Sequence, residues 1–284
     1  MRTININKYK INFIKITKLF FIILMMAIAL ISPLFMQGCS SNQINPHQYE
    51  NNKTLTTFTI SKNIKTICSY AFAYSSVKEI IFEENSCLEV IESYAFDGCI
   101  NLEKITFPKS LKRIESSAFQ NCNKLSEINF NEGLEYIGSR AFNMCAVTSN
   151  KKLNIKLPNS LINTGGHVFQ NSKIGNIILG KNMKKIESYD FYNTGFDNIT
   201  IYSSTTEIKD GSLDCDLPLA TTGYYNIYLP DKKYNLYFTG YKFKYNRLKN
   251  IYYSGSEQDW QNYVSTNLLE INLDNDSIQI HYNY

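Results

Sequence analysis

A short motif centred on a phenylalanine recurs six times in the middle of this chain. The copies are 24, 23, 23, 27 and 22 residues apart, at Phe72, Phe96, Phe119, Phe142, Phe169 and Phe191. A unit of roughly 20 to 29 residues cannot bury its apolar side alone, so such a period indicates units stacked on copies of themselves. The sequence therefore predicts a solenoid.

Each copy carries apolar residues at fixed distances from its phenylalanine. Five residues before it the chain has Ile67, Ile91, Ile114, Ile137 and Ile186, and Ile208 precedes Leu213 in a degenerate seventh copy. After the motif comes an alternating stretch such as Leu102, Ile105 and Phe107. Alternation with period two predicts a strand with one face on the core. The fold class that follows is a mainly β repeat solenoid of roughly 23-residue units.

A small residue lies three positions after each phenylalanine: Ser75, Cys99, Cys122, Cys145, Ser172 and Thr194. Three cysteines at one offset could indicate a metal site or a disulfide ladder. The position exchanges with serine and threonine, however, and no Cys-x-x-Cys spacing occurs, so no metal is expected. A small buried spacer is the interpretation we favour, because free cysteine packs as a compact apolar residue.

Residues Leu102 to Leu125 fit the pattern L-x-x-I-x-F-P-x-x-L-x-x-I-x-x-x-A-F-x-x-C-x-x-L. This pattern resembles the BspA-type leucine-rich repeats of Treponema pallidum-like repeat proteins. The resemblance covers roughly Phe58 to Leu213 and implies a leucine-rich repeat stack. The 27-residue copy departs from the pattern, because it has a four-residue insertion and Thr164 in place of the core isoleucine.

The first 38 residues have the layout of an export signal, with five basic residues, no acidic one and an apolar run from Leu19 to Phe35. The run ends in FMQGCSSN, which looks like a lipoprotein cleavage site with Cys39 as the lipidated residue. We therefore expect a signal peptide over 1–38 and a lipid-anchored, exported protein at the bacterial cell surface. The alternative is an uncleaved membrane anchor, since such a run can nearly span a bilayer.

Residues 39–54 are rich in Asn, Ser and Gln without apolar periodicity, which predicts a flexible tether before a solenoid over 55–213. The chain has 29 basic and 25 acidic residues, but the first 38 residues hold five of the basic ones. The exported part is thus nearly neutral. No nucleic-acid partner is expected, because the electrostatic support for one belongs to the signal.

Residues 214–284 predict a degenerate repeat followed by a β-rich C-terminal cap. Ser256 and Asp259 fit a capping box before a short helix that carries Trp260, and the segment from 278 to 282 alternates as a closing strand. The many tyrosines here favour packing in half-buried strands. They could also form a stacking platform for sugars, with Tyr224, Tyr228 and Tyr241 as its candidates.

No catalytic residue is assigned, and no enzyme or cofactor is expected. The three histidines, His47, His167 and His281, are scattered along the chain, and no nucleophile elbow, phosphate loop or dinucleotide motif occurs. Acidic residues at one offset, such as Glu92, Glu115 and Glu187, are expected to face solvent.

The outward positions of the strands remain as the candidate binding face. Those chosen as candidate site residues are Ile81, Thr106, Asn129, Lys156, Ile178, Thr200, Asn154, Asn176 and Asn198. Solenoids usually bind through extended repeat surfaces, although single residues here could serve solubility alone. The resemblance implies binding of a protein, or of a glycan, in adhesion to host or neighbouring cells. The alternative function is an envelope scaffold for the cell's own protein or polysaccharide components.

Overall fold

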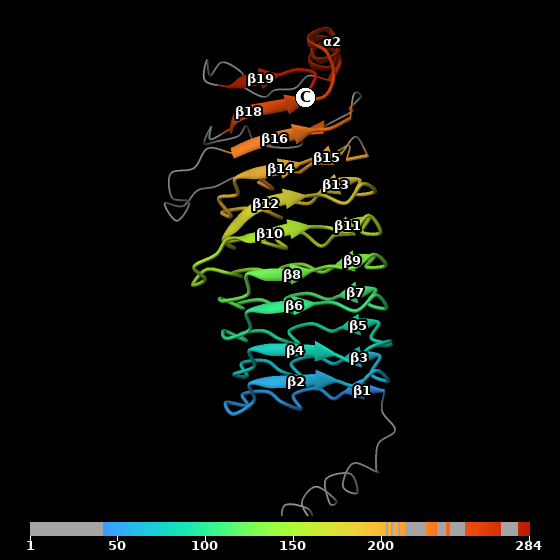
Figure 1. Ribbon diagram of the computed structural model, residues 1–284, viewed down its shortest axis with the longest axis vertical. Coiled ribbons are helices and arrows are strands. Elements are labelled where there is room, and N and C mark those ends of the chain that lie inside the picture. The colour runs from blue at the N-terminus through green and yellow to red at the C-terminus, as the bar shows by residue number, and fades with distance from the viewer. Residues whose placement is uncertain are drawn as a thin grey trace, which may run out of the picture. The chain divides into compact units, whose positions relative to one another are not determined.

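The computed structural model describes residues 42–202, 204–205, 207–209, 211–213, 225–231, 237–238, 248–267 and 278–284. The described residues from Asn42 onward form one unit, in which the chain winds as successive coils stacked in one direction (Figure 1). Each coil returns the chain beside its previous turn, and this is the crossover that parallel strands require. The predicted mainly β repeat solenoid is confirmed.

One side of the stack carries the alternating strands that the sequence predicts. They form a four-stranded parallel sheet and a six-stranded parallel sheet with a break between β8 and β10. The strands are β2 Thr57–Ile60, β4 Glu79–Phe82, β6 Lys104–Thr106, β8 Glu127–Asn129, β10 Leu153–Lys156, β12 Ile174–Ile178, β14 Asn198–Thr200, β16 Tyr225–Leu229, β18 Leu248–Tyr253 and β19 Gln279–His281.

A second side carries two-residue strands, and in the regular copies their inward member is the isoleucine five positions before the phenylalanine. They form a six-stranded and a three-stranded parallel sheet, with a break between β11 and β13. The strands are β1 Gln43–Ile44, β3 Thr66–Ile67, β5 Val90–Ile91, β7 Arg113–Ile114, β9 Tyr136–Ile137, β11 Asn163–Thr164, β13 Lys185–Ile186, β15 Glu207–Ile208 and β17 Tyr237–Phe238.

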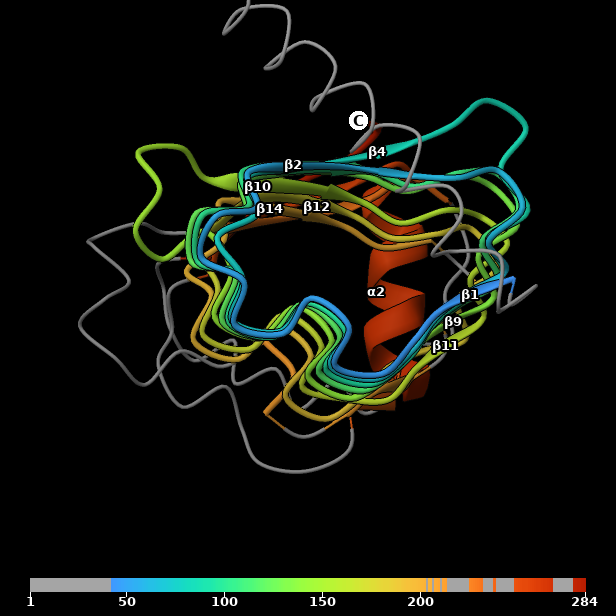
Figure 2. The same ribbon diagram turned by 90° about the horizontal axis from the view of Figure 1, so that it is seen from below.

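The third side of each coil, around the phenylalanine, is not a strand but is still bonded from coil to coil. Residues two before and two after the phenylalanine are left-handed, for example Tyr94 at φ 60° and Gly98 at φ 66° around Phe96. This backbone points the phenylalanine N–H along the stack, so that Phe96 N donates to the Ala118 carbonyl of the next coil at 2.7 Å. Figure 2 shows the coils superposed on all three sides.

The recurring phenylalanines form a continuous stack in the core. Neighbouring rings from Phe72 to Phe191 are 4.9 to 5.6 Å apart and within 11° of parallel, and all six are buried. A fixed coil height places each ring on the next, so the motif must repeat at the same point of every coil. The core isoleucines and leucines surround this stack.

In four of the six copies the small residue after the phenylalanine is a hydrogen-bond donor to the preceding coil as well as a spacer. Cys99 Sγ donates to the Phe72 carbonyl at 3.1 Å, and Cys122 and Cys145 repeat this bond to Phe96 and Phe119. Ser172 Oγ makes the same bond to the Phe142 carbonyl at 2.7 Å. Burial raises the pKa of the Cys99 thiol to about 12, so the proton that it donates stays on sulfur. The exchange of Cys with Ser thus follows from a shared bond.

The repeat is interrupted where two core positions become polar. Thr164 replaces the core isoleucine, and Asp190 occupies a buried position that is alanine or valine in the preceding copies. Asp190 accepts hydrogen bonds from the Thr164 hydroxyl at 2.7 Å, Val168 N at 3.2 Å and Glu187 N at 3.0 Å. In regular copies the amide at the Glu187 position bonds to the previous coil instead. The two substitutions therefore compensate each other where β11 and β13 no longer pair.

The prediction of a flexible tether is wrong over the residues that the structure describes. The first coil begins at Asn42, since β1 pairs with β3 and Ile44 is buried. Tyr49 stacks on Phe72 with ring centroids 5.0 Å apart and so occupies the phenylalanine position of this coil. Asn, Ser and Gln in the turns between these anchors concealed the pattern, because Tyr49 lacks the surrounding motif.

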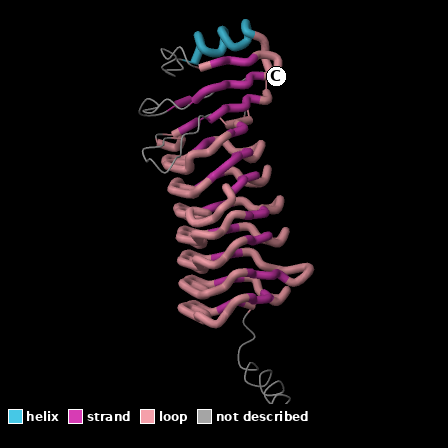
Figure 3. The backbone as a smooth tube through the Cα atoms, turned by 60° about the vertical axis from the view of Figure 1, so that its left-hand side comes forward, coloured by secondary structure: helices cyan, strands magenta, loops and turns pink. Residues whose placement is uncertain are grey.

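The stack also continues beyond residue 213, because β16, β18 and β19 add to the same sheet as β14. The helix α2, Glu257–Asn267, lies at the C-terminal end of this unit (Figure 3). Ser256 N donates to Asp259 Oδ2 and Asp259 N donates to Ser256 Oγ, which confirms the capping box. Trp260 is buried against Tyr253 and fixes the helix on the last coils.

We expect Cys122→Ser to be more stable than Cys122→Ala. A hydroxyl can replace the thiol bond to the Phe96 carbonyl, whereas alanine removes it, which should cost about 1 kcal/mol of unfolding free energy. Urea unfolding of both variants measures the difference. A purely apolar spacer would give the opposite order.

We expect unfolding free energy to depend on pH through Asp190. Burial raises the pKa of Asp190 to about 7, against an ordinary value of 3.8, although its hydrogen bonds act in the opposite direction. Below pH 4 the carboxyl is protonated in both states. Between pH 4 and pH 7 the unfolded chain ionises first, so stability falls as pH rises and levels off above 7.

Asp190→Asn should abolish this contribution. Relative to that variant, the wild type should lose about 3 kcal/mol between pH 5 and pH 8, which denaturant titrations at each pH can measure. Equal pH profiles of the two proteins would contradict the assignment.

Candidate binding surface

The strands of the first side, β2 to β8 in the four-stranded sheet and β10 to β19 in the six-stranded sheet, present two parallel rows of side chains to the outside. One row lies on each side of the inward residue. The leading row precedes that residue and the trailing row follows it, as the register of the strand pairs shows. The leading row contains Glu79, Lys104, Glu127, Asn154, Asn176, Asn198, Asn226, Asn250 and Gln279. The trailing row contains Ile81, Thr106, Asn129, Lys156, Ile178, Thr200, Tyr228, Tyr252 and His281.

All nine residues predicted for the binding face lie in these rows. Thr106 is opposite Asn129, Lys156 is opposite Ile178, and Ile178 is opposite Thr200. Ile81, Thr106, Asn129, Lys156, Asn154 and Asn176 are exposed, whereas Ile178, Thr200 and Asn198 are half-buried. The sequence thus placed these side chains on one surface.

The asparagines of the leading row are joined to one another in a single ladder. Asn176 Nδ2 donates to Asn154 Oδ1 at 3.0 Å, and Asn198 Nδ2 donates to Asn176 Oδ1 at 2.6 Å. Asn226 and Asn250 continue the ladder at 2.8 Å each. His281 Nε2 lies 3.0 Å from Asn250 Oδ1 and ends it.

The sequence analysis did not include Asn226 and Asn250 in the candidate face, although the sequence contains a pattern that marks them. Each ladder asparagine directly precedes an inward isoleucine, as Asn-Ile in five successive strands. Asn176, Asn198 and Asn226 each use one side-chain donor and one acceptor on their neighbours, so the ladder joins successive coils. Each also keeps a second N–H hydrogen beyond these bonds.

Aromatic rings continue the trailing row at the C-terminal end. Tyr228 stacks on Tyr252 with centroids 4.7 Å apart, and Tyr252 stacks on His281 at 4.6 Å. Burial, and then the neighbouring Tyr252 and Tyr284, raise the pKa of Tyr228. The rings cover one another's faces, so they resemble a packing ladder more than a sugar platform. Tyr224 and Tyr241 lie outside the described residues.

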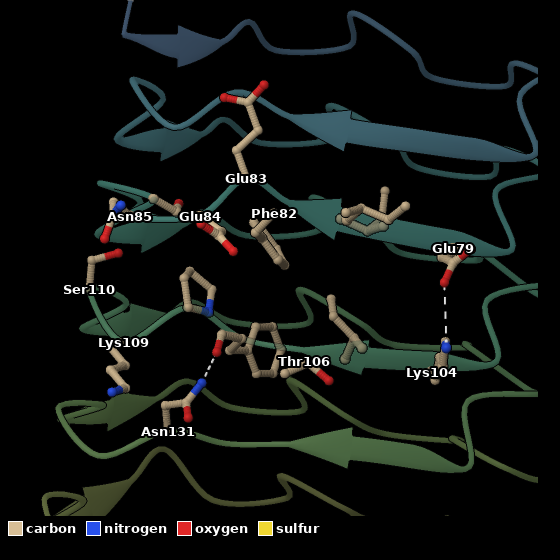
Figure 4. Close-up of a pocket in the computed structure, with 16 residues that line it drawn as sticks. Glu79, Phe82, Glu83, Glu84, Asn85, Lys104, Thr106, Lys109, Ser110 and Asn131 are labelled. Carbon is tan, nitrogen blue, oxygen red and sulfur yellow. Dashed lines mark hydrogen bonds and ion pairs between the residues drawn. The ribbon is translucent and has the colours of Figure 1, made fainter.

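A hollow of about 610 Å³ opens beside β4 and β6. The loop after β4 forms one wall with Glu83, Glu84 and Asn85, and the opposite wall includes Lys109 and Ser110 (Figure 4). Its apolar lining includes Phe82, Phe107 and Pro108, with exposed Ile81 at the edge. This loop, residues 83–89, is one residue longer than the loop after β6, residues 107–112, in agreement with the interval of 24 residues against 23 in the next copy.

Two further hollows lie on the same face. One, of about 660 Å³, is bordered by charged residues that include Lys78, Glu103, Lys151 and Lys152. The other, of about 610 Å³, crosses the break between β8 and β10, where Asn129 and Lys156 border it together. Half-buried Phe130 contributes an apolar part to this third hollow. The face therefore combines apolar floors with rims of both charges.

The ion pairs on this face are exposed. Lys104 lies 3.5 Å from Glu79, and Lys152 lies 2.5 Å from Asp197. Within the described ranges, no group of three or more His, Cys, Asp or Glu side chains could hold a metal ion. His47 lies 2.7 Å from Glu50, and His167 lies 3.0 Å from Gln170.

The expectation that the repeated acids simply face solvent is wrong for two of them. Glu92 accepts hydrogen bonds from both the amide and the hydroxyl of Ser69 in the preceding coil, at 2.9 and 3.0 Å. Burial raises the pKa of Glu187, but hydrogen bonds from Lys209 and Lys185 outweigh it and hold the pKa below its ordinary value. These acids bridge coils.

The BspA-type leucine-rich repeat region, in six copies, matches residues 42–152 and 148–272. These ranges cover well over half of the chain, which therefore belongs to the BspA-type leucine-rich repeat family. The match begins at the first coil and extends past residue 213, as the structure does. Among curated proteins no sequence matches the chain.

Solved leucine-rich repeat structures are similar to the chain at low identity. The T. pallidum leucine-rich repeat protein is 20% identical over 73% of this chain and 84% of its own, with a TM-score of 0.44. A leucine-rich repeat protein from Bacteroides ovatus is 17% identical over 85% and 81%, with a TM-score of 0.38. A leucine-rich cell surface protein from Faecalibacterium prausnitzii is 15% identical over 77% and 84%, with a TM-score of 0.28.

Cys39 and the predicted signal peptide lie outside the described residues. In the part of the chain that the structure describes, no helix has the length and apolar character to cross a membrane.

We expect Asn198→Ala to destabilise the fold, because it removes the two side-chain bonds that join Asn176 to Asn226. The loss should be about 1 kcal/mol or more of unfolding free energy, measured by urea unfolding. Lys156→Ala, an exposed change on the same face, is the matched control. Equal stability of the two variants would contradict a structural role for the ladder.

Proposed function

We propose that this chain is an exported, lipid-anchored surface protein that binds a protein partner through the outward face of β2 to β19, in adhesion to host or neighbouring cells. Leucine-rich repeat proteins generally bind other proteins, and an extended repeat surface accumulates many weak contacts on a rigid frame. The signal-like segment and Cys39 support export and lipidation.

One observation carries the proposal: three hollows lie on one face, where outward side chains of the strands border apolar side chains. Ile81 is 43% exposed at the edge of the first hollow, beside the half-buried Phe82. An apolar floor within a charged rim is the arrangement of a protein-binding patch, in which an apolar anchor is surrounded by polar contacts. Mixed rim charges favour a protein over a polyanion.

We expect Ile81→Asp to weaken partner binding about tenfold or more, because a charge would replace an apolar contact at the first hollow. The measurement is a solid-phase assay with the mature protein against extracellular-matrix proteins and host cells. Ile162→Asp is the matched control, since Ile162 is 49% exposed but lies beside β11 on another side of the coil.

Absence of saturable binding to matrix proteins and cells would contradict adhesion, and equal loss with both variants would contradict this face. Protease treatment of whole cells separates adhesion from the alternative of an inward-facing envelope scaffold. A displayed adhesin is removed by the protease, whereas a scaffold inside the envelope survives.

A further inference from the structure

The first coil leaves apolar core positions half-covered. Tyr49, Leu55, Phe58 and Ile64 are partly buried. The same positions in the second coil are held by Phe72, Val77, Ile80 and Leu88, which are all at most 5% exposed. The difference arises because the second coil has a neighbour on both sides, whereas the first has a described neighbour on one.

This end of the stack is open in other respects too. Within the described chain, β2 pairs only with β4, so its other edge has no strand partner there. The opposite end is closed by α2, whose Trp260 is buried against Tyr253. Solenoids normally cover their terminal coils, because an apolar end in water is costly. The first coil therefore needs a cover.

Three lysines lie at this end, and acids of the second coil flank two of them: Lys65 Nζ lies 3.7 Å from Glu89, and Lys62 N donates to Glu83. Residues 42–65 contain Lys53, Lys62 and Lys65, all exposed, and a single acid, Glu50, which lies 2.7 Å from His47. Phe, Leu and Tyr side chains next to lysines have the composition of surfaces that rest on an anionic lipid interface. The excess of lysines over acids in residues 42–65 favours a negatively charged partner over a basic one.

The short segment between Cys39 and the first coil indicates what covers this end. Cys39 is three residues from Asn42, so the first coil cannot lie further than about 10 Å from an acyl group on that thiol. The 16-residue tether expected from the sequence would have allowed about 50 Å. With the first coil ordered from Asn42, the anchor leaves almost no slack.

We propose that the open end of the first coil seats on the bilayer surface, with Tyr49, Leu55, Phe58 and Ile64 toward the lipid interface and Lys53, Lys62 and Lys65 on anionic headgroups. This inference rests on the lipid anchor of the proposed function. It makes the membrane the missing N-terminal cap, and it directs the later coils away from the bilayer.

The test uses the full chain, produced with radiolabelled palmitate in a bacterium that processes lipoproteins and reconstituted in vesicles of phosphatidylcholine and phosphatidylglycerol. Lysine reactivity with an amine reagent is then followed by mass spectrometry. Lys53, Lys62 and Lys65 should react at least about threefold more slowly than Lys151 and Lys156, which are also exposed but lie in a distant coil. The protection should weaken in vesicles of phosphatidylcholine alone.

A charge-reversed variant tests the contact while the anchor stays. Lys53→Glu with Lys62→Glu should restore the reactivity of Lys65, whereas Lys151→Glu with Lys156→Glu should not. The melting temperature and the circular dichroism of both variants should match the wild type.

The outcomes separate the two proposals. No palmitate on wild type relative to Cys39→Ala refutes the anchor and the seating with it. Palmitate with equal reactivity of all five lysines refutes the seating alone. Protection that follows protein concentration rather than lipid charge, with cross-links between first coils, assigns the cover to a second copy and also refutes it.

Discussion

The structure depends on the bonding of each coil to the next at the same height on all three sides. Strand ladders provide this on two sides. On the third, where no strand forms, the amides of Phe72 to Phe191 donate to carbonyls of the following coil. Because the backbone bonds leave the coil rather than close within it, a single coil has no independent stability. The phenylalanine stack follows from this spacing, and the donors Cys99, Cys122, Cys145 and Ser172 reinforce it from within.

The sequence predicted the parts of the fold that depend on periodic burial. The inward isoleucines, the phenylalanine core and the two outward rows all follow from the position of each residue relative to the phenylalanine of its copy. The reason is that the same neighbours surround each position in every regular coil. Left-handed backbone at Tyr94 and Ser117 was out of reach, since neither residue type indicates positive φ. The bond from Cys122 to the Phe96 carbonyl was also invisible, because donor and acceptor are 26 residues apart. Tyr49 was missed because one aromatic residue carries no period.

Irregular repeats show how far the scheme tolerates change. The 27-residue copy keeps its phenylalanine in the stack, but the sheet breaks between β8 and β10 and the short ladder breaks one coil later, between β11 and β13. At the second break the Asp190 carboxyl accepts the hydrogen bond from Glu187 N. In the regular copies a backbone carbonyl of the preceding coil accepts the equivalent bond. In a stack whose stability is a sum over neighbouring coils, such a joint is where segments can separate. Its ionisation makes this joint more sensitive to pH than the regular coils.

Bonds between coils also order the side chains of the outer face. Asparagines that bond along the leading row are already ordered, so a partner that reaches their remaining N–H groups would meet little loss of side-chain entropy. The hollows lie instead where the repeat departs from its pattern, at the longer loop after β4 and at the break beside β8. Regular coils thus make the surface rigid, and irregular coils form the hollows in it. A face built in this way can be altered at the exposed loop residues without loss of the core, because the loop contacts with the phenylalanine stack come from Phe107 and Phe130, directly after β6 and β8.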